Sequence, residues 1–271
     1  MSPMIPIYIP TYGRERVITL DQLPPSILSH VVLVCDKTTA VSNLKPGVKV
    51  VKSFAQGKGG PTVKQAIINR AIRDGHSRIA ILDDDLVFQS ARFDDGVKKF
   101  SKATPAEVRA GFDECIKVLE PEDVALAGFC TPFFNTGEDR WKYARRIVHA
   151  LFIDLEATER AGAAFDKVPT MGDVWFNLKL AVAGFNTAQF QDMAVIDAAK
   201  RGEGGESALP GRETRHLAAV EILERDFPGF VVRRKTSSKA FRESIGGDID
   251  ITTYMGRAVK HGRKNLSNRG Q

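Results

Sequence analysis

Short apolar runs alternate with turns over the first 90 residues of the chain, and four of them are typical of buried strands. Between the third and fourth runs, residues 62–74 carry apolar side chains at helical spacing, with a proline before them and a glycine after. Strands that alternate with helices predict an α/β fold around a mostly parallel sheet. The predicted strands are residues 5–9, 31–35, 48–51 and 79–82.

The α/β pattern continues through the middle of the chain. A capping box with proline at the first helical position, Thr104-Pro105-Ala106-Glu107, predicts a helix that runs to about residue 120. Further on we expect two strands, two helices and a mobile loop that is rich in glycine and charge. The strands are residues 124–129 and 147–153, the helices 172–183 and 213–225, and the loop 201–211.

The positive charge of the chain is concentrated at its C-terminal end. The formal net charge is +6, and residues 231–271 contain ten Lys or Arg against three Asp or Glu. We therefore expect a catalytic domain over residues 1–230 and a basic segment over residues 231–271. Such a segment fits a polyanionic partner such as DNA, although it could also be merely a solubilising tail.

The sequence predicts a cytoplasmic protein. It has no apolar run near the roughly 20 residues that span a bilayer, and no basic region followed by an apolar stretch and a cleavage site. The three cysteines, Cys35, Cys115 and Cys130, are widely spaced and predict buried thiols rather than disulfides or a zinc site.

Three consecutive carboxylates, Asp83-Asp84-Asp85, end the strand at residues 79–82. Alternate residues of an extended chain point the same way, so Asp83 and Asp85 can face one site and Asp84 another. Like charges this close repel unless a cation offsets them, and hard divalent ions bind carboxylate and phosphate oxygens together. The triplet predicts a metal bound to a diphosphate, although a solvated acidic turn is the alternative.

The turns after the first two strands carry further polar candidates. Thr11 and Arg14 follow the first strand and Asp36 follows the second, where ligands of open α/β sheets bind. Asp36 could equally be an ordinary turn residue. The chain has neither GxGxxG after its first strand nor a GxxxxGK[ST] loop, which argues against dinucleotide-binding and P-loop proteins.

Taken in order, these motifs resemble family 2 glycosyltransferases of the GT-A fold, which is Rossmann-like. The resemblance covers residues 5 to about 185 and implies a nucleotide-sugar donor of the UDP-glucose type with Mn²⁺ or Mg²⁺. It implies that the donor is contacted by several of the residues above, and that Asp83 and Asp85 bind the metal. The implied donor contacts are Thr11, Arg14, Asp36, Lys64, Asp83 and Asp84.

Asp173 is the candidate catalytic base. Residues 170–184 resemble the family's Glu-Asp motif, which opens a helix that ends at a glycine, but Gly172 stands in place of the glutamate. In inverting members the aspartate removes the proton of the acceptor hydroxyl. From the residues alone, Asp173 could instead be a helix N-terminal acid stabilised by the helix dipole. Trp175 could stack on a sugar or base, or belong to the core.

The glycine-rich loop and the basic C-terminal end resemble the TET-associated glycosyltransferases of bacteriophages, which modify 5-hydroxymethylcytosine in DNA. That resemblance places such an enzyme in the host cytoplasm. Arg212 and Arg215 could neutralise the leaving diphosphate, and His216 could complete the metal shell or pair with a donor phosphate. His149 could be a core histidine or face the acceptor. Contacts to DNA phosphates are expected from Arg233, Arg234, Lys235 and Lys239.

The predicted function is therefore a metal-dependent inverting hexosyltransferase that acts on 5-hydroxymethylcytosine in phage DNA. The same motifs could serve a glycan or protein acceptor. A sugar-phosphate nucleotidyltransferase also uses an α/β sheet and metal-binding carboxylates, but it usually has a glycine-rich N-terminal loop. A catalytically inactive DNA-binding protein is a further alternative.

Overall fold

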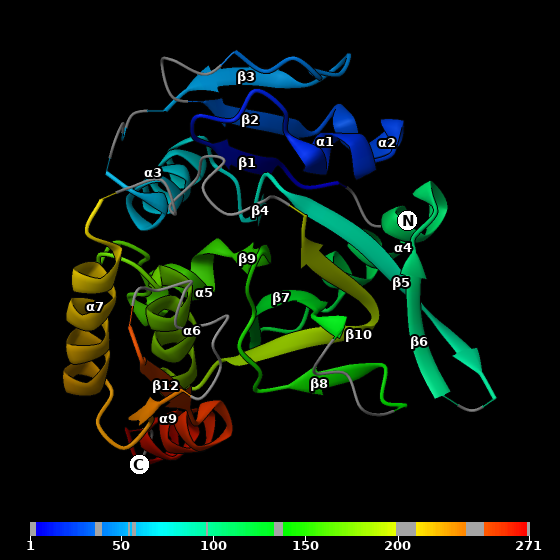
Figure 1. Cartoon of the computed structure of the whole chain (residues 1–271). Helices are drawn as coiled ribbons and strands as arrows, with labels where there is room; N and C mark the ends of the chain where they lie inside the picture. The colour runs from blue at the N-terminus through cyan, green and yellow to red at the C-terminus, as the bar shows by residue number, and fades with distance from the viewer. Residues whose placement is uncertain are drawn as a thin grey trace.

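The computed structural model describes residues 4–35, 40–53, 55, 58–95, 97–132, 138–198, 210–236 and 247–269. These residues form a central mixed sheet with helices on both faces, so the predicted α/β class is confirmed (Figure 1). No helix in these ranges is long and apolar enough to cross a membrane. The three cysteines are buried thiols.

The first half of the sheet is parallel. Its strand order is β3-β2-β1-β4, and Ile7 at the start of β1 lies between Val31 of β2 and Ala80 of β4. The carboxyl ends of β1 and β4 therefore open at the same edge, which brings the turns that follow them together. The elements are β1 (Ile7–Thr11), β2 (Val31–Cys35), β3 (Lys49–Lys52), α3 (Gly60–Arg73) and β4 (Arg78–Leu82).

The second half of the sheet is largely antiparallel. The order continues β9-β7-β10-β5-β6, and the long strand β10 pairs in parallel with β7 and antiparallel with β5 and β8. Because β10 spans this half, its last residue, Asp197, reaches the edge where β4 ends. The strands are β5 (Leu86–Asp94), β6 (Val97–Lys102), β7 (Val124–Cys130), β8 (Trp141–Tyr143), β9 (Ala150–Asp154) and β10 (Asn186–Asp197).

Two apolar clusters pack the helices onto opposite faces of the sheet. The first cluster contains four phenylalanines in edge-to-face or tilted contact, from β5, α4, β7 and β9. The predicted capping box of α4 is formed, with Thr104 and Glu107 bonded reciprocally. The second cluster lies beneath α3, α5 and α6. The remaining helices are α1 (Ile18–Gln22), α2 (Pro25–Leu28), α4 (Pro105–Lys117), α5 (Leu155–Ala161), α6 (Gly172–Val182) and α7 (Arg212–Asp226).

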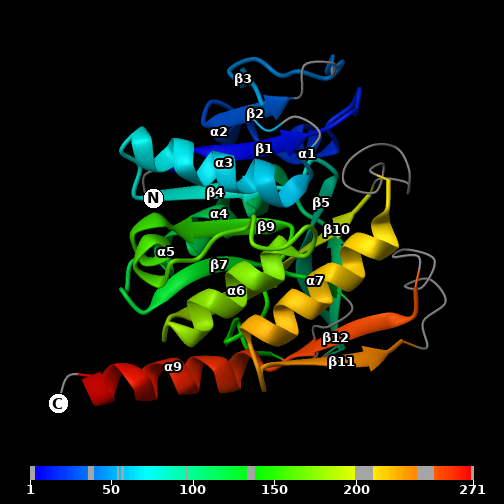
Figure 2. The ribbon, with the colours of Figure 1, turned by 90° about the vertical axis from the view of Figure 1, so that its left-hand side faces the viewer.

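The basic C-terminal segment folds onto the outer side of α6. It contains the hairpin of β11 (Val231–Lys235) and β12 (Ile249–Thr253), followed by α9 (Met255–Arg269). Figure 2 shows α9 lying below α6 and α7. A third apolar cluster joins these elements, and it includes Trp175 of α6, Leu223 of α7 and Val259 of α9. The outer face of α6 is thus buried by residues from the C-terminal segment.

Gly262 lets α9 approach the end of α6 closely. A Cβ at this position would lie 2.4 Å from the backbone nitrogen of Gly184 and 2.6 Å from the carbonyl oxygen of Val182. We expect Gly262→Ala to lower the free energy of unfolding by about 1–3 kcal/mol, because overpacking forces the two helices apart. Chemical denaturation measures the effect. Gly256→Ala in the same helix has open space at Cβ and is the matched control. Equal stability of the two variants would contradict the close docking.

Candidate active site

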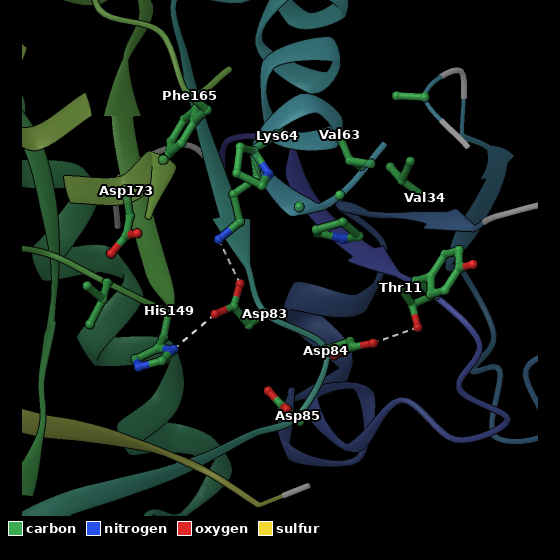
Figure 3. Close-up of a pocket in the computed structure, with 18 of the residues that line it drawn as sticks. Thr11, Val34, Val63, Lys64, Asp83, Asp84, Asp85, His149, Phe165 and Asp173 are labelled. Atoms are coloured by element: carbon green, nitrogen blue, oxygen red, sulfur yellow. Dashed lines mark hydrogen bonds and ion pairs between the residues drawn. The ribbon is translucent and has the colours of Figure 1, made fainter. Parts of the chain in front are cut away.

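A cavity of about 490 Å³ lies where β1 and β4 end, within the size range of pockets that hold a small-molecule ligand. Its walls come from both halves of the sheet and from α3 and α6, as Figure 3 shows. Eight residues singled out from the sequence line it, and Asp197 of β10 and Arg146 line it in addition. The eight are Thr11, Arg14, Lys64, Asp83, Asp84, Asp85, His149 and Asp173.

Asp83 lies between two cationic side chains. Its Oδ1 is 2.8 Å from Nζ of Lys64, and its Oδ2 is 3.0 Å from Nδ1 of His149. Burial alone raises the pKa of Asp83, but the charge of Lys64 and the hydrogen bond and charge of His149 outweigh it and hold that pKa well below the usual range. Asp83 is therefore an ionised carboxylate at neutral pH.

Asp84 points away from Asp83, toward β1, as the alternation of side chains predicts. Its Oδ2 accepts a 2.6 Å hydrogen bond from the hydroxyl of Thr11, and its Oδ1 is 3.3 Å from Nε of Arg14. Burial raises the pKa of Asp84 to about 6, and the opposing charge of Arg14 and hydrogen bond of Thr11 reduce this effect only in part. Asp84 thus orients Thr11, the last residue of β1, and Arg14 in the turn that follows.

Asp85 is held in place from two directions. Its Oδ2 is 2.8 Å from Nη2 of Arg14, and its backbone carbonyl accepts from the backbone N–H of Ala198 after β10. Thr19 of α1 fixes the same turn, because its hydroxyl donates to the carbonyl of Asp83 and accepts from the backbone N–H of Leu86. The turn after β4 is therefore rigidly positioned by its neighbours.

His149 joins the two halves of the sheet at the cavity. Its Nδ1 lies 3.0 Å from Asp83 and 3.3 Å from Oδ1 of Asp197. Its backbone has φ of +65°, a left-handed conformation that is strained for a residue other than glycine and concentrates at functional sites. Burial lowers the pKa of His149, but the hydrogen bond and charge of Asp83 and the charge of Asp197 outweigh it and raise that pKa to about 9.

The pairing of His149 predicts a measurable titration. We expect Asp83→Asn to lower the pKa of His149 from about 9, because the largest stabilising partner of the imidazolium is removed while its burial remains. Proton–nitrogen NMR of labelled histidine across pH measures it. His149→Gln assigns the signal by its disappearance. An unchanged pKa would mean that the two side chains do not interact in solution.

The same pairing has a consequence for stability. Because the folded-state pKa of His149, about 9, exceeds the ordinary value of 6.5, charged His149 stabilises the fold fully below about pH 6.5. That contribution is lost as the pH rises through about 9.

A second, smaller cavity of about 230 Å³ adjoins the first. Arg146, Met171 and Asp173 line both cavities, so Asp173 stands at their common boundary. The far wall of the second cavity comes from the first turns of α7 and from β12. Its other residues are Thr170, Val174, Arg212, His216, Asp250 and Ile251.

The structure separates some of the predicted residues from the carboxylate turn. Arg212 and His216 line the second cavity, where Nε2 of His216 lies 2.9 Å from the carbonyl of Ile249. Arg215 lines neither of the two cavities described above. Trp175 is buried in the third apolar cluster and donates through Nε1 to Asp226 at 2.9 Å. Asp36, Lys239 and most of the predicted loop over 201–211 lie outside the described residues.

Sequence reasoning missed Asp197 and Arg146. Asp197 ends a long strand that was not predicted, and it meets His149 only through pairing across the sheet. Arg146 is exposed, and its side chain forms no ion pair or hydrogen bond with the described residues. No local motif marks either residue. The doublet Arg145-Arg146 just ahead of the strand predicted at residues 147–153 was the one available signal.

The donor chemistry at the carboxylate turn fits a divalent cation. Burial raises the pKa of Asp197, and the charges of Asp85 and Asp83 raise it further against the opposing charge of His149. These carboxylates therefore repel one another, and a hard cation with oxygen preference would relieve that repulsion. Within the described part of the chain, no three His, Cys, Asp or Glu side chains are already grouped as metal ligands.

The sequence of the protein matches a profile that describes one protein family. The profile described as TET-Associated Glycosyltransferase matches residues 5–205, which is most of the chain. The protein therefore belongs to the TET-associated glycosyltransferase family and is a glycosyltransferase. No curated protein matches it.

Several solved structures are similar to the chain in outline. They include Staphylococcus aureus TarS 1–349, at 15% identity and a TM-score of 0.44, covering 71% of this chain and 59% of that one. A mycobacterial protein has 12% identity and a TM-score of 0.48, covering 93% and 84%. GalNAc-T7 with UDP, GalNAc and Mn²⁺ has 11% identity and a TM-score of 0.42, covering 83% and 48%. The chain thus spans 59% of the TarS fragment.

Proposed function

We propose that the protein is a metal-dependent inverting glycosyltransferase that moves a sugar from a UDP-glucose-type donor to 5-hydroxymethylcytosine in DNA. The observation that carries the proposal is that Asp173 lines the same cavity as the Asp83–Asp85 turn, on the side of Asp83 away from Asp84 and Thr11 (Figure 3). A nucleotide sugar bound between them would have its diphosphate near the turn and its anomeric carbon near Asp173.

The donor site combines cations and carboxylates. Arg14 and Lys64 supply positive charge for the nucleotide and diphosphate, and a hydrogen bond to Asp84 orients the hydroxyl of Thr11. Asp83 and Asp85 would hold the divalent cation, which would offset charge on the leaving diphosphate. The sequence-based assignment of His216 as a third metal ligand stays a prediction, as do the assignments of Asp36, Arg212 and Arg215 to the donor.

Asp173 has the environment that a general base requires. It is the second residue of α6 and half-buried, and its carboxylate has no ion pair or hydrogen bond among the described residues. In the proposed step, the acceptor oxygen forms a bond to the anomeric carbon while the bond from that carbon to the diphosphate oxygen breaks. The hydroxyl proton passes to the Asp173 carboxylate. Direct displacement with one carboxylate base inverts the anomeric centre.

The assignment of DNA as acceptor is supported by the family and by the charge of the C-terminal segment. Arg234 and Lys235 on β11 and Lys260 and Lys264 on α9 are exposed. Part of this charge is already offset, since Arg233 pairs with Glu224 at 2.8 Å and Arg234 pairs with Asp250. Basic side chains of this kind bind phosphates without reading sequence.

The proposal is tested by donor hydrolysis and sugar transfer with UDP-glucose, Mn²⁺ and DNA that contains 5-hydroxymethylcytosine. Unmodified DNA and an Asp85→Ala variant are the controls. We expect metal-dependent transfer to the modified DNA alone, and little transfer by the variant. Donor hydrolysis without transfer would reject this acceptor, and pyrophosphate release from a nucleoside triphosphate and a sugar phosphate would indicate a nucleotidyltransferase instead.

A further inference from the structure

The smaller cavity shares Asp173 with the larger one. Because Asp173 lines both cavities, a donor in the larger one leaves the smaller one as the direction from which an acceptor hydroxyl can reach the carboxylate. Its volume of about 230 Å³ is below the roughly 300 Å³ at which pockets for drug-sized ligands begin. The space therefore suits a single ring rather than a nucleotide sugar.

Two carboxylates line the smaller cavity. Asp173 comes from the start of α6 and Asp250 from β12. Arg234 pairs with Oδ2 of Asp250, with Nε at 3.1 Å, and this bond orients the carboxylate. Its Oδ1 makes no hydrogen bond with the described residues, so it can accept one from a ligand.

A modified cytosine carries two groups that can donate hydrogen bonds to carboxylates. In 5-hydroxymethylcytosine the exocyclic amine at C4 and the hydroxymethyl arm at C5 are neighbours on the ring. A carboxylate accepts well from the cytosine amine, whereas the corresponding oxygen of a uracil ring is an acceptor and would be repelled. With this acceptor, Asp250 would accept from the amine and Asp173 from the hydroxyl.

Arg146 supplies a positive charge beside the smaller cavity, where the phosphates of the acceptor strand would lie. Arg146 is exposed, lines both cavities and has no polar partner for its side chain among the described residues. A base turned out of the stack brings its flanking phosphates to the rim of the pocket that receives it. Arg146 would neutralise one of those phosphates.

We propose that the smaller cavity binds the acceptor pyrimidine, with Asp250 accepting a hydrogen bond from its C4 amine. The proposal rests on the function proposed above, and it would place Arg212 and His216, which line the same cavity, at the acceptor in place of the donor and the metal. Asp250 is a specificity residue in this scheme, and Arg146 binds the adjacent phosphate. The hairpin of β11 and β12 then takes part in base recognition in addition to its general affinity for the backbone.

The test compares two acceptor bases rather than two activities. Sugar transfer is measured as kcat/KM on single-stranded oligonucleotides that contain either 5-hydroxymethylcytosine or 5-hydroxymethyluracil, at one salt concentration. We expect Asp250→Asn to reduce the preference for the cytosine base by about tenfold, because the amide can donate to the uracil oxygen. General damage to the hairpin would lower both rates and leave their ratio unchanged.

Asp248→Asn is the matched control for Asp250→Asn. It makes the same substitution at an exposed position just before β12 that lines neither cavity, so the ratio should stay near the wild-type value. An unchanged ratio in Asp250→Asn, with transfer intact, would overturn the base-subsite proposal and leave the proposed function standing. Donor hydrolysis by the wild type without transfer to either base would overturn both.

Discussion

Asp173→Asn is expected to lower kcat for sugar transfer by about 10²–10⁴-fold, the usual contribution of a general base. An amide cannot take the proton of the acceptor hydroxyl, so the nucleophile stays neutral. Donor binding should change little, because the described residues nearest the proposed diphosphate site are Arg14 and Lys64. Single-turnover kinetics and donor titration by fluorescence separate the two effects.

The competing interpretation of Asp173 is structural, and stability measurements distinguish it. A helix N-terminal acid contributes about 0.3–1 kcal/mol through the helix dipole, so its loss would lower stability slightly without affecting kcat. Glu156→Gln is the matched control, since Glu156 occupies the first turn of α5, is exposed and lies outside both cavities. If the Asp173→Asn protein folds and transfers sugar at the normal rate, Asp173 is not the general base.

Gly172→Glu, which restores the Glu-Asp pattern of the wider glycosyltransferase families, is expected to abolish activity and destabilise the fold. A Cβ at Gly172 would lie 2.5 Å from the carbonyl oxygen of Phe165 and 2.9 Å from Cβ of Pro61. Even Gly172→Ala should cost about 1–3 kcal/mol, because backbone and a proline ring cannot yield cheaply. Thermal unfolding and transfer assays of both variants measure these losses, and we expect Gly172→Glu to lose more stability and activity than Gly172→Ala.

A second variant separates the effect of the glutamate side chain from the effect of its position. Gly256→Glu makes the same substitution at an exposed position with open space around Cβ. It should leave both stability and activity near wild type. If Gly172→Glu were as stable and active as Gly256→Glu, the tight contact with Pro61 and Phe165 would not explain the missing glutamate of the motif.

The elements that sequence reasoning predicted well are those whose pattern is local. The strand at 31–35 was predicted with its observed bounds, and α4 begins at the predicted capping box. Continuous apolar runs and caps depend on neighbouring residues only, so they can be read without the fold. The same reasoning identified Asp83–Asp85, because consecutive carboxylates after an apolar run are unusual in any fold.

The elements that were missed depend on distant partners. The sequence of β11, Val-Val-Arg-Arg-Lys, reads as a charged tail, and it becomes a strand through its pairing with β12. Likewise α9 carries many basic residues, and only its narrow face around Val259 and Gly262 packs on α6. His149 and Asp197 meet because β4, β9 and β10 belong to one sheet. Such contacts cannot be inferred from local spacing.

The dependence of α6 on the C-terminal segment limits how the enzyme can be divided. The family match ends at residue 205, yet α7, the β11–β12 hairpin and α9 cover the apolar outer face of the helix that carries Asp173. A fragment cut at that boundary would present Trp175 and Leu178 to water and tend to aggregate. Grafting residues 5–205 into a chimaeric enzyme would therefore transfer the sugar-nucleotide pocket but leave its base on an unsupported helix.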